Sequence, residues 1–498
     1  MGRVLTNKIS LAQAIEATLG VLPGSPVWRL LEPNTISTYG ATITTVARNP
    51  ISKLRQRRKG TITDLDSSVE FEHDLTKEAF IYNAEGFAFA TFTTVPFRRV
   101  SESDTLAAAT GPNRYTFATA LAGAPAANTL LYARGWTLAA NNGLKVVTTG
   151  STTTVVNVTD TLAAETPTAA QHASIEVAGV RGAVGDIQMN GSGNLISTVL
   201  DFTTLGLTNG QMIHVGGLTS TNQFATAAYV GYARVVSVTA NLITLDKRSW
   251  TVGAADNGAT KQIDLLFGRF LRNVAVDHAS FIERSFQFEL AMPGLQNPSG
   301  DMYEYSKGNL CNEMVFDLPL TEKATVTFGF IGTDTPPPTA TRASGAATPV
   351  NPVETAAFNT TSGIARLRIL QTNETSITTC FKSLTLTLAN NVTPEKCLGT
   401  LGASFMNQGN FDVNLEAQLL FTDFEVPTAI RNNTTLTMDF VVKNSDGAIG
   451  VDIPSMTLGD GTKEFPVNES VLINVSGEAF NDATLGTSIG ISLFPVVP

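Results

Sequence analysis

The feature that most constrains this chain is one β pattern that occurs twice. Residues 43–75 align without a gap with residues 385–417, which lie 342 positions further on. Among the identical residues, Ala47, Asn49 and Gly60 fall on Ala389, Asn391 and Gly402. Both stretches end in alternating apolar and polar residues, the period of a half-buried strand. The pattern predicts a strand, a long loop and a second strand used twice, although 43% hydrophobic residues also allow chance alignment.

A second pair of segments supports a duplication. Residues 320–329 resemble residues 467–476 at an offset of 147 positions, and both read as a turn followed by a closing strand. The two offsets differ by 195 positions. The first copy is therefore expected to contain an insertion of about that length between its opening and closing strands, because the second copy lacks the extra chain.

The composition favours a β protein with several domains. A chain of 498 residues corresponds to about three domains. Only 15% of its residues are charged and Gly occurs 41 times, with abundant Thr, Ala and Asn. Such a mixture favours strands and turns over long helices. The low charged fraction also suggests that neighbouring subunits cover much of the surface.

The charge and the cysteines exclude several function classes. A net charge of −10 opposes nonspecific binding to nucleic acid. Three widely spaced cysteines without a C-x-x-C motif argue against a disulfide framework and a structural zinc site, and fit assembly in a reducing cytoplasm. The N-terminus lacks the apolar core of a secretory signal, and no uninterrupted apolar run is long enough to span a membrane. We expect a soluble or virion-bound protein without membrane insertion.

The first 27 residues are predicted to form an N-terminal arm with a short helix. Ser10 and Gln13 have the spacing of a capping box, apolar residues follow at helical spacing, and Gly20 provides a stop. Packing on its own domain and contact with a neighbouring subunit are both compatible with such a helix.

Changes in composition along the chain divide the rest of the sequence into segments. Two β domains are expected, each with a flanking helix, at residues 76–88 in the first and, shortened by Pro427, after Phe421 in the second. The expected segments are residues 28–100 with 262–334 (first domain), 101–261 (an insertion of two small β-barrels, about 101–175 and 176–261), 335–363 (a Pro/Ala/Thr linker) and 364–498 (second domain).

Catalytic machinery is hard to find in the sequence. None of the four histidines lies in a metal-binding or triad-like context, and no nucleophile elbow, Walker loop or dinucleotide fingerprint occurs. A pair of catalytic carboxylates cannot be selected among 43 acidic residues. We therefore expect a protein that is not an enzyme, with no cofactor and no metal site.

The densest charge cluster lies in the loop of the first repeat and consists of Lys53, Arg55, Arg57, Arg58 and Lys59. The equivalent loop of the second repeat has no such cluster. Contact with an acidic neighbouring subunit is the favoured use, since charge pairs at an interface rim set register and partner choice. A solvated loop and a nucleic-acid contact are the alternatives, the latter without aromatic residues for base stacking.

Residues 47–76 (ARNPISKLRQRRKGTITDLDSSVEFEHDLT) and 307–332 (KGNLCNEMVFDLPLTEKATVTFGFIG), with the Ala/Gly-rich insertion, resemble the major tail (tail tube) proteins of bacteriophages with long non-contractile tails. The resemblance implies that both β domains are tail-tube-type β-sandwich or barrel domains. Their inner sheets would join between subunits, usually six single-domain subunits to a ring. Two tube units in one chain then imply a trimeric ring with pseudo-sixfold symmetry, and an insertion that decorates the outside.

The resemblance also implies partners and a location. The expected partners are further copies of the chain, the tape-measure, tail terminator and distal tail proteins, and genomic DNA that passes through the lumen without sequence-specific binding. The location would be the virion tail, assembled in the host cytoplasm. The alternative is a capsid-decoration, fibre or receptor-binding virion protein whose inserted β domains bind host glycans, and a tail-associated hydrolase ranks third.

Overall fold

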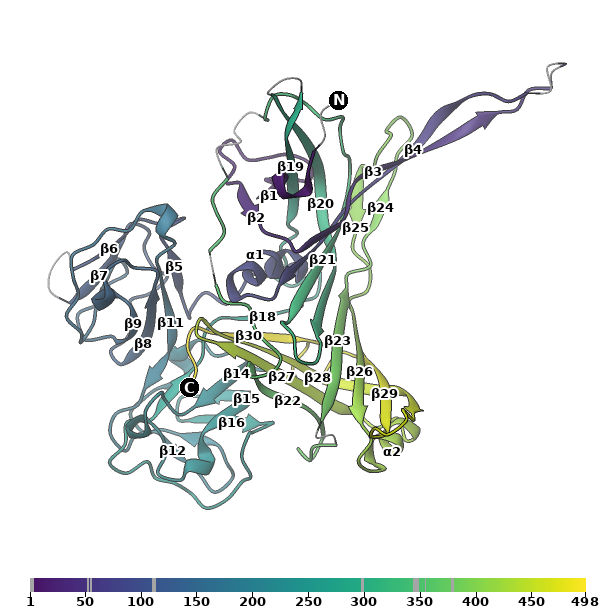
Figure 1. Ribbon diagram of the computed structural model, residues 1–498. Helices are drawn as coiled ribbons and strands as arrows, with labels where there is room; N and C mark the ends of the chain where they lie inside the picture. The colour runs from purple at the N-terminus through teal and green to yellow at the C-terminus, as the bar shows by residue number, and fades with distance from the viewer. Residues whose placement is uncertain are drawn as a thin grey trace.

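The computed structural model describes residues 4–51, 53, 56–109, 113–296, 300–343, 349–353, 355–377 and 380–498, without the side chains of residues 227, 295 and 296. The described chain is mainly β, which confirms the predicted fold class (Figure 1). Two α-helices lie at the expected places, α1 at Lys77–Phe87 and α2 at Glu425–Arg431. The Thr76 side chain accepts a hydrogen bond from the Ala79 amide and so caps α1.

Fifteen strands form the main sheet. They are β1 (Ser10–Ile15), β2 (Arg29–Leu31), β3 (Thr35–Arg48), β4 (Arg58–Asp74), β18 (Phe270–Arg272), β19 (Ser285–Gln296), β20 (Gly300–Leu318), β21 (Thr325–Gly332), β22 (Ile364–Gln371), β23 (Phe381–Ala389), β26 (Asp412–Leu420), β27 (Leu436–Asn444), β28 (Gly447–Glu464), β29 (Leu472–Ala479) and β30 (Gly490–Phe494). A small separate hairpin, β24 (Thr393–Glu395) with β25 (Phe405–Asn407), continues beyond β23 and β26.

The main sheet contains one topology twice. In the first half the chain runs β3, β4, α1, β19, β20, β21, and in the second half β23, β26, α2, β27, β28, β29. In each half the last strand lies between two earlier strands and pairs with both of them. The resulting strand orders are β3-β4-β21-β20 and β23-β26-β29-β28. An identical order of five strands and a helix supports the duplication suggested by the sequence repeat.

Residues that align between the two repeats do not have equivalent cross-strand partners in the two hairpins. In the second hairpin Ala389 lies opposite Asp412. The aligned residues of the first hairpin are Ala47 and Glu70, yet Glu70 lies opposite Thr38, and Ala47 lies near the hairpin tip, next to the pair Val46 and Thr61. The two hairpins therefore differ in register, because alternation along a strand does not fix which residue of the partner it meets.

Two strands turn from one layer of the fold into the other. Leu310 in the middle of β20 pairs with Ser285 of β19 on one side and with Ile331 of β21 on the other. Met456 in the middle of β28 pairs in the same way with Leu436 of β27 and Ala479 of β29. The first part of each long strand thus lies in one layer and the second part in the other, as at a sandwich corner.

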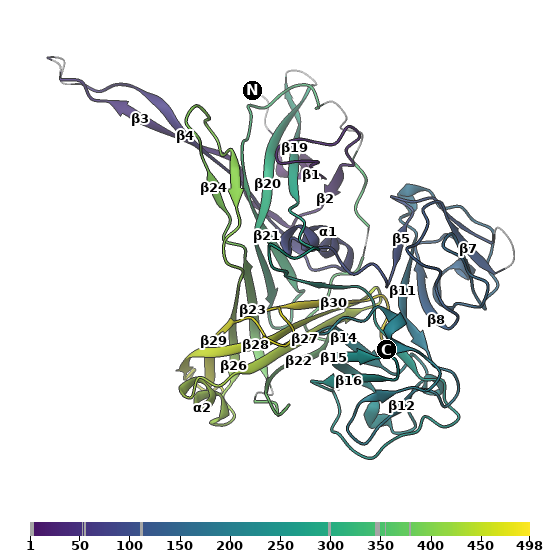
Figure 2. The same cartoon turned by 180° about the vertical axis from the view of Figure 1, so that it is seen from behind.

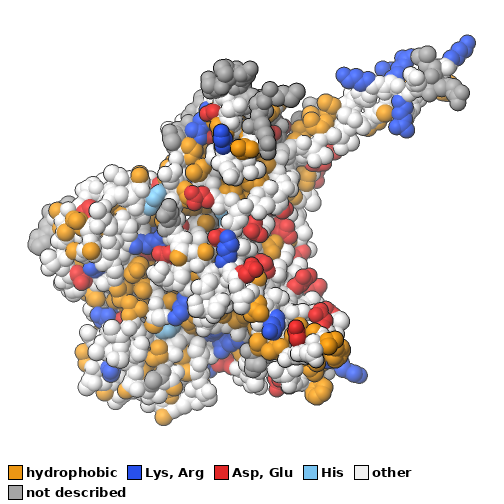
Figure 3. Space-filling model, viewed as in Figure 1, with side chains coloured by type: hydrophobic (Ala, Val, Ile, Leu, Met, Phe, Trp, Pro, Cys, Tyr) orange, Lys and Arg blue, Asp and Glu red, His pale blue; other side chains and the backbone are white. Residues whose placement is uncertain are grey.

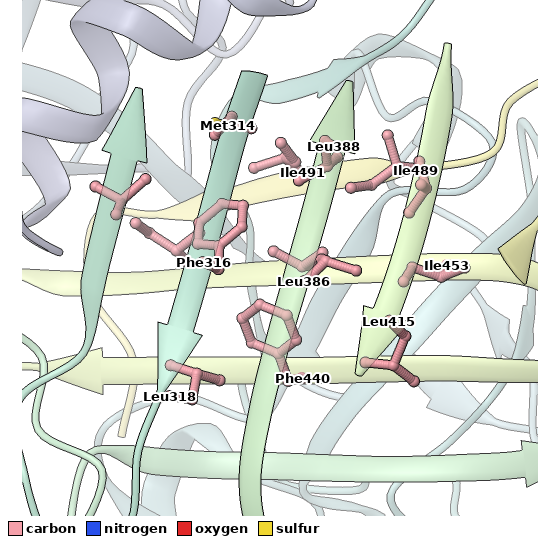
Figure 4. Packing of buried hydrophobic residues seen from close by; sticks show 14 of the residues in the cluster. Met314, Phe316, Leu318, Leu386, Leu388, Leu415, Phe440, Ile453, Ile489 and Ile491 are labelled. Atoms are coloured by element: carbon pink, nitrogen blue, oxygen red, sulfur yellow. The ribbon is translucent and has the colours of Figure 1, made fainter. Parts of the chain in front are cut away.

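The core lies between these layers. Figure 4 shows side chains of β20, β23 and β26 facing those of β27, β28 and β30, whose strands cross beneath them. Phe316 is fully buried and its ring contacts Phe80 of α1 and Phe440 of β27, with centroid separations of 5.6 Å and 6.1 Å. One cluster of buried side chains spans both halves, so the two copies of the topology share a core.

The N-terminal segment is a strand, and the predicted helix at Ser10–Leu19 is wrong. Ser10–Ile15 forms β1, which pairs with β19 on one edge and β2 on the other. Leu11, Ala12, Gln13 and Ala14 are all buried, a pattern of a strand covered on both faces. Pairing on both edges supplies the backbone hydrogen bonds that a helix would otherwise make internally, and so overrides the local capping signal.

The chain between α1 and β18 forms a separate β region beside the main sheet (Figures 1 and 2). Its strands are β5 (Arg98–Val100), β6 (Leu106–Ala108), β7 (Arg114–Phe117), β8 (Thr129–Arg134), β9 (Gly143–Val146), β10 (Val155–Asn157), β11 (Ser174–Arg181), β12 (Gln188–Met189), β13 (Leu195–Ile196), β14 (Met212–Val215), β15 (Gly231–Thr239), β16 (Leu242–Asp246) and β17 (Asp264–Leu266). Within the described residues, ten of these strands form one sheet, β6, β7 and β10 form a second, and one hydrophobic cluster extends from Phe97 to Phe267. The division into two small barrels near residue 175 stays a prediction, and β11 spans that border.

Buried ion pairs fix the inserted region to the main sheet. The Lys77 ammonium of α1 lies 2.6 Å from Glu176 of β11, and neither side chain is more than 4% exposed. On the other side, Arg234 of β15 lies 3.0 Å from Asp452 of β28 and 2.7 Å from Asp246. Because a buried charge without its partner is costly, these pairs hold the region in one position.

The Pro-rich segment expected as a linker at residues 335–363 follows the surface of the first half. Thr339 forms a β-bridge with Tyr303 of β20, and Val350 forms one with Arg29 of β2. Parts of this segment lie outside the described residues. Its role as a linker between two tube domains stays a prediction.

Candidate assembly surfaces of the main sheet

Six neighbouring strands, in the order β4, β21, β20, β23, β26, β29, turn one face to the core and the other to solvent. Their cross-strand pairing aligns the solvent-face residues in rows. One row is Glu72, Thr327, Val315, Thr387, Asn414 and Glu478. The next row is Asp74, Thr325, Asp317, Thr385, Glu416 and Ser476. A continuous polar surface therefore crosses both halves of the sheet.

This surface, which we call the acidic face, carries many carboxylates. They are Asp64, Asp66, Glu70, Glu72, Asp74, Glu313, Asp317, Asp412, Glu416 and Glu478. On the described strands, none of the solvent-face positions between these residues is Lys or Arg. In Figure 3, red side chains gather on the part of the surface over these strands. A surface with this charge repels the phosphates of nucleic acid.

The sequence contained a signal for the acidic face that motif searching missed. From Asp64 to Leu75, acidic residues and Ser occupy most even positions, and Leu65, Val69 and Phe71 lie at odd positions between them. The odd residues are buried. Period-two alternation of acids with apolar residues therefore places a row of carboxylates on one face of a strand.

The two halves join through β20 and β23. The register pairs Glu313 with Ala389 and Leu318 with Leu384, and the Thr385 hydroxyl donates a 3.0 Å hydrogen bond to the Asp317 carboxylate. The second part of β20 thus has β21 on one side and β23 on the other. We call this pairing the junction.

Both ends of the joined sheet have a free edge. Within the described chain, β4 is the only strand that pairs with β3, so the other edge of Thr35–Arg48 faces solvent. At the opposite end, residues 457–464 of β28 pair with β29 alone among the described strands. This stretch corresponds in topology to the part of β20 that pairs with β23. Unpaired backbone groups on both edges make the chain a template for pairing with another copy.

The predicted contact cluster lies at the tip of the β3/β4 hairpin, which projects from the body (Figure 1). Lys53, Arg57, Arg58 and Lys59 are exposed and form no ion pair within the described part of the chain. Arg55 lies outside the described residues. In Figure 3 blue side chains gather toward this tip.

The second hairpin lies beside the first and uses its only lysine internally. Lys396, which follows β24, has its ammonium 2.6 Å from the Asp66 carboxylate and also contacts Asp64 on β4. The hydrogen bond from Lys396 lowers the pKa of Asp64 below its usual value. Both hairpins therefore project from the same end of the sheet.

Among the described residues, no group of three or more His, Cys, Asp or Glu side chains is arranged to hold a metal ion. No helix in the described part of the chain has the length and apolar character needed to cross a membrane. Cys311 is buried, Cys380 is half-buried and Cys397 is exposed, and all three are free thiols.

The fold and these surfaces define a mainly β protein organised around a duplicated sheet with an acidic face and two open edges. The family model of the phage tail tube protein matches residues 248–479, which include β18 to β29. Over this span the chain is similar to the phage tail tube protein family, which supports the resemblance noted in the sequence. No curated protein matches the chain. This similarity supports a structural component of the virion tail and favours a function other than catalysis.

Proposed function

We propose that copies of this chain polymerise through their sheet edges into rings, and that the rings stack into the tail tube that conducts DNA at ejection. The observation that carries the proposal is the correspondence between the junction and the two free edges. Inside one chain the second part of β20 pairs with β23. The equivalent strands, residues 457–464 of β28 and β3, have a free edge at opposite ends of the same sheet.

Pairing β28 of one copy with β3 of the next repeats the junction between chains. A head-to-tail contact of this kind closes into a ring when the rotation per unit divides a full turn. The two halves of a chain, residues 28–100 with 262–334 and 364–498, then occupy two equivalent positions. Three chains supply six positions, so a trimeric ring with pseudo-sixfold symmetry follows.

Ring closure gives the acidic face a role. The joined strands form the inner wall, and the acidic face lines the channel with carboxylates and hydroxyls. DNA passing through it is repelled by the wall and does not adhere. The inserted region, residues 101–261, lies on the outside, since it packs against β27, β28 and β30, which form the layer opposite the acidic face.

The basic tip of the β3/β4 hairpin extends beyond the ring plane in this arrangement. We infer that Lys53, Arg55, Arg57, Arg58 and Lys59 contact acidic side chains of a neighbouring subunit. Reversing the charge of Arg57 and Arg58 should then shorten the tubes. Added salt should weaken stacking of the unmodified protein and strengthen stacking of the variant, because it screens the attraction in the first and the repulsion in the second. Tubes of unchanged length and salt dependence would contradict this contact.

Electron microscopy of the concentrated protein in negative stain tests the proposal. Stacked rings or tubes with an axial channel are expected. Isolated elongated trimers would instead favour a fibre or receptor-binding protein whose inserted domains bind glycans. The tape-measure, tail terminator and distal tail proteins are the further partners that a tube in a virion tail, assembled in the host cytoplasm, requires.

A peptide competitor tests the edge pairing itself. A synthetic peptide of residues 35–48 carries the β3 edge and should cap residues 457–464 of β28, which leaves chains unable to add the next copy. Addition before assembly should reduce the yield of rings and tubes in a dose-dependent way. A scrambled peptide of the same composition is the matched control, and equal effects of both peptides would count against edge pairing.

A further inference from the structure

Exposed apolar side chains lie at the tip of the second hairpin, residues 396–405, which we call the hairpin end. Leu398 is fully exposed, and Phe405 and Leu401 are also solvent-facing. Lys396 in the same loop is held by Asp64 and Asp66, so the loop has a fixed base from which Leu398 projects. Large apolar side chains grouped at a fixed tip indicate a surface that another molecule covers.

A second apolar group lies at residues 421–425 and 465–469, which we call the turn end. Phe424, Phe465 and Val467 are each more than 70% exposed. The two segments lie close together, since the Phe421 amide donates to the carbonyl of Val471, just after the second segment. Within the first segment the Phe421 and Phe424 rings lie 5.8 Å apart. A hollow of about 380 Å³ beside Phe424 is lined by Thr428 and Ala429 of α2. Orange surface gathers in this region in Figure 3.

The hairpin end and the turn end lie at opposite ends of the same strands. β23 leads into the hairpin at its C-terminal end, and β26 leads from the hairpin to α2 (Figure 1). Leu420 at the end of β26 pairs with Leu472, which follows the 465–469 turn. β23 and β26, with nine residues each, span roughly 30 Å, and the hairpin end lies further out, at the tip of β24 and β25.

We propose that the hairpin end of one copy docks on the turn end of a second copy stacked on it along the strand direction. The contact rests on the proposed function, since it is the axial contact between successive rings. Leu398 and Phe405 cover Phe465 and Val467 of the second copy, and the hollow beside Phe424 receives a side chain from the hairpin end.

Charge supports the same stacking direction. The end of the sheet that carries both hairpins presents the basic cluster of the first hairpin. The turn end and the residues next to it carry more negative than positive charge. Four exposed acids, Asp423, Glu425, Glu464 and Glu469, outnumber two exposed bases, Lys463 and Arg431. Opposite net charges therefore meet when one copy stacks on another.

The turn end, which lies in the second half, offers the hairpin end more apolar surface than the equivalent turn of the first half. The corresponding turn between β20 and β21 contains one exposed large apolar side chain, Leu320, at the position that aligns with Val467. Three exposed apolar side chains give more area to bury than one, and burial of apolar area drives association.

Disulfide trapping tests the contact, because Cys397 already lies next to Leu398. In a Cys380→Ser background, the variant Val467→Cys should give a ladder of covalent dimers and higher multimers when assembled tubes are oxidised and run without reductant. Unassembled protein should give no ladder. The matched control Val467→Cys with Cys397→Ser should also give none.

The outcomes separate this inference from the proposed function. Tubes that assemble and yield no ladder would overturn the axial contact and leave the tube intact. A ladder from Leu320→Cys in place of Val467→Cys would overturn the pairing of the two ends. Failure of the unmodified protein to form any ring or tube would instead overturn the proposed function.

A second variant avoids cysteine chemistry. Leu398→Asp places a charge in the contact and should raise the protein concentration needed for tube formation about ten-fold or more, while ring formation is unchanged. The matched control is Leu138→Asp, an exposed leucine of the inserted region. Equal tube formation by both variants would overturn the contact.

Discussion

The Thr385 hydroxyl of β23 donates a 3.0 Å hydrogen bond to the Asp317 carboxylate of β20, on the acidic face and across the junction of the two halves. Both residues are half-buried and lie in one cross-strand row. The same row contains Asp74 and Glu416 further along the sheet. The junction is thus a continuous part of the acidic face, and each of the two halves contributes carboxylates to it.

Reversing charges on the acidic face should make assembled tubes retain DNA. The double variant Glu72→Lys with Glu416→Lys should bind a fluorescent duplex oligonucleotide at about 50 mM salt and release it as salt rises, because phosphate contacts are lost through counterion competition. Co-sedimentation of the oligonucleotide with tubes measures this. The control is Asp277→Lys, an exposed acid in the loop between β18 and β19. Equal retention by control and double variant would show that position on the sheet does not matter.

Removal of the Phe316 ring should destabilise the fold. Phe316 contacts α1 through Phe80 and the second layer through Phe440, so Phe316→Ala leaves a cavity at the centre of the core. A loss of about 3–5 kcal/mol in the free energy of unfolding is expected. Chemical denaturation of the unassembled protein measures it. The exposed Phe465→Ala should change stability by less than about 0.5 kcal/mol, and a similar loss in both variants would contradict this account of the core.

The Lys77–Glu176 ion pair should stabilise the docking of the inserted region on the main sheet more than it stabilises the fold of the inserted region itself. Lys77→Met leaves Glu176 buried without its closest partner, which is expected to cost about 3 kcal/mol. Limited proteolysis should then cut the connections near residue 100 faster. The double variant Lys77→Met with Glu176→Gln removes the unpaired charge and should recover much of the loss. No recovery in the double variant would mean that packing rather than charge dominates.

Two buried histidines predict a loss of stability in mild acid. Burial lowers the pKa of both His73 and His214 from 6.5 to about 4, while each ring faces a backbone carbonyl, of Glu32 and Gly216 respectively. The neutral ring is therefore the form that the fold accepts. Between pH 6.5 and 4 the unfolded chain binds more protons than the folded chain, so stability falls as pH falls through this window.

The expected size is about 2 kcal/mol for each histidine at pH 5. Urea unfolding at pH 7.5 and pH 5 measures the difference. His214→Gln should reduce it relative to the unmodified protein, because the carboxylates contribute equally in both. An unchanged difference would show that His214 does not set this part of the pH dependence.

The sequence by itself determined the local features of this protein. Period-two alternation placed β4 and β26 on strands, helical spacing placed α1 at Lys77–Phe87, and the repeated pattern indicated one topology used twice. These signals depend on neighbours a few residues away in the chain, and the physics of capping and alternation acts at that range. The basic cluster was likewise visible because its residues are adjacent.

Only the tertiary structure decided which strands meet. Ser10–Ile15 is a strand because β19 and β2 pair with both its edges, and the first hairpin departs from the aligned register because a strand's partner is set by distant chain. The rows that unite Glu72 with Glu478, and the free edges of β3 and β28, exist only once the sheet is assembled. Pairing between strands far apart in sequence carries no local signature, so the acidic face and the open edges emerge from the fold and not from any segment.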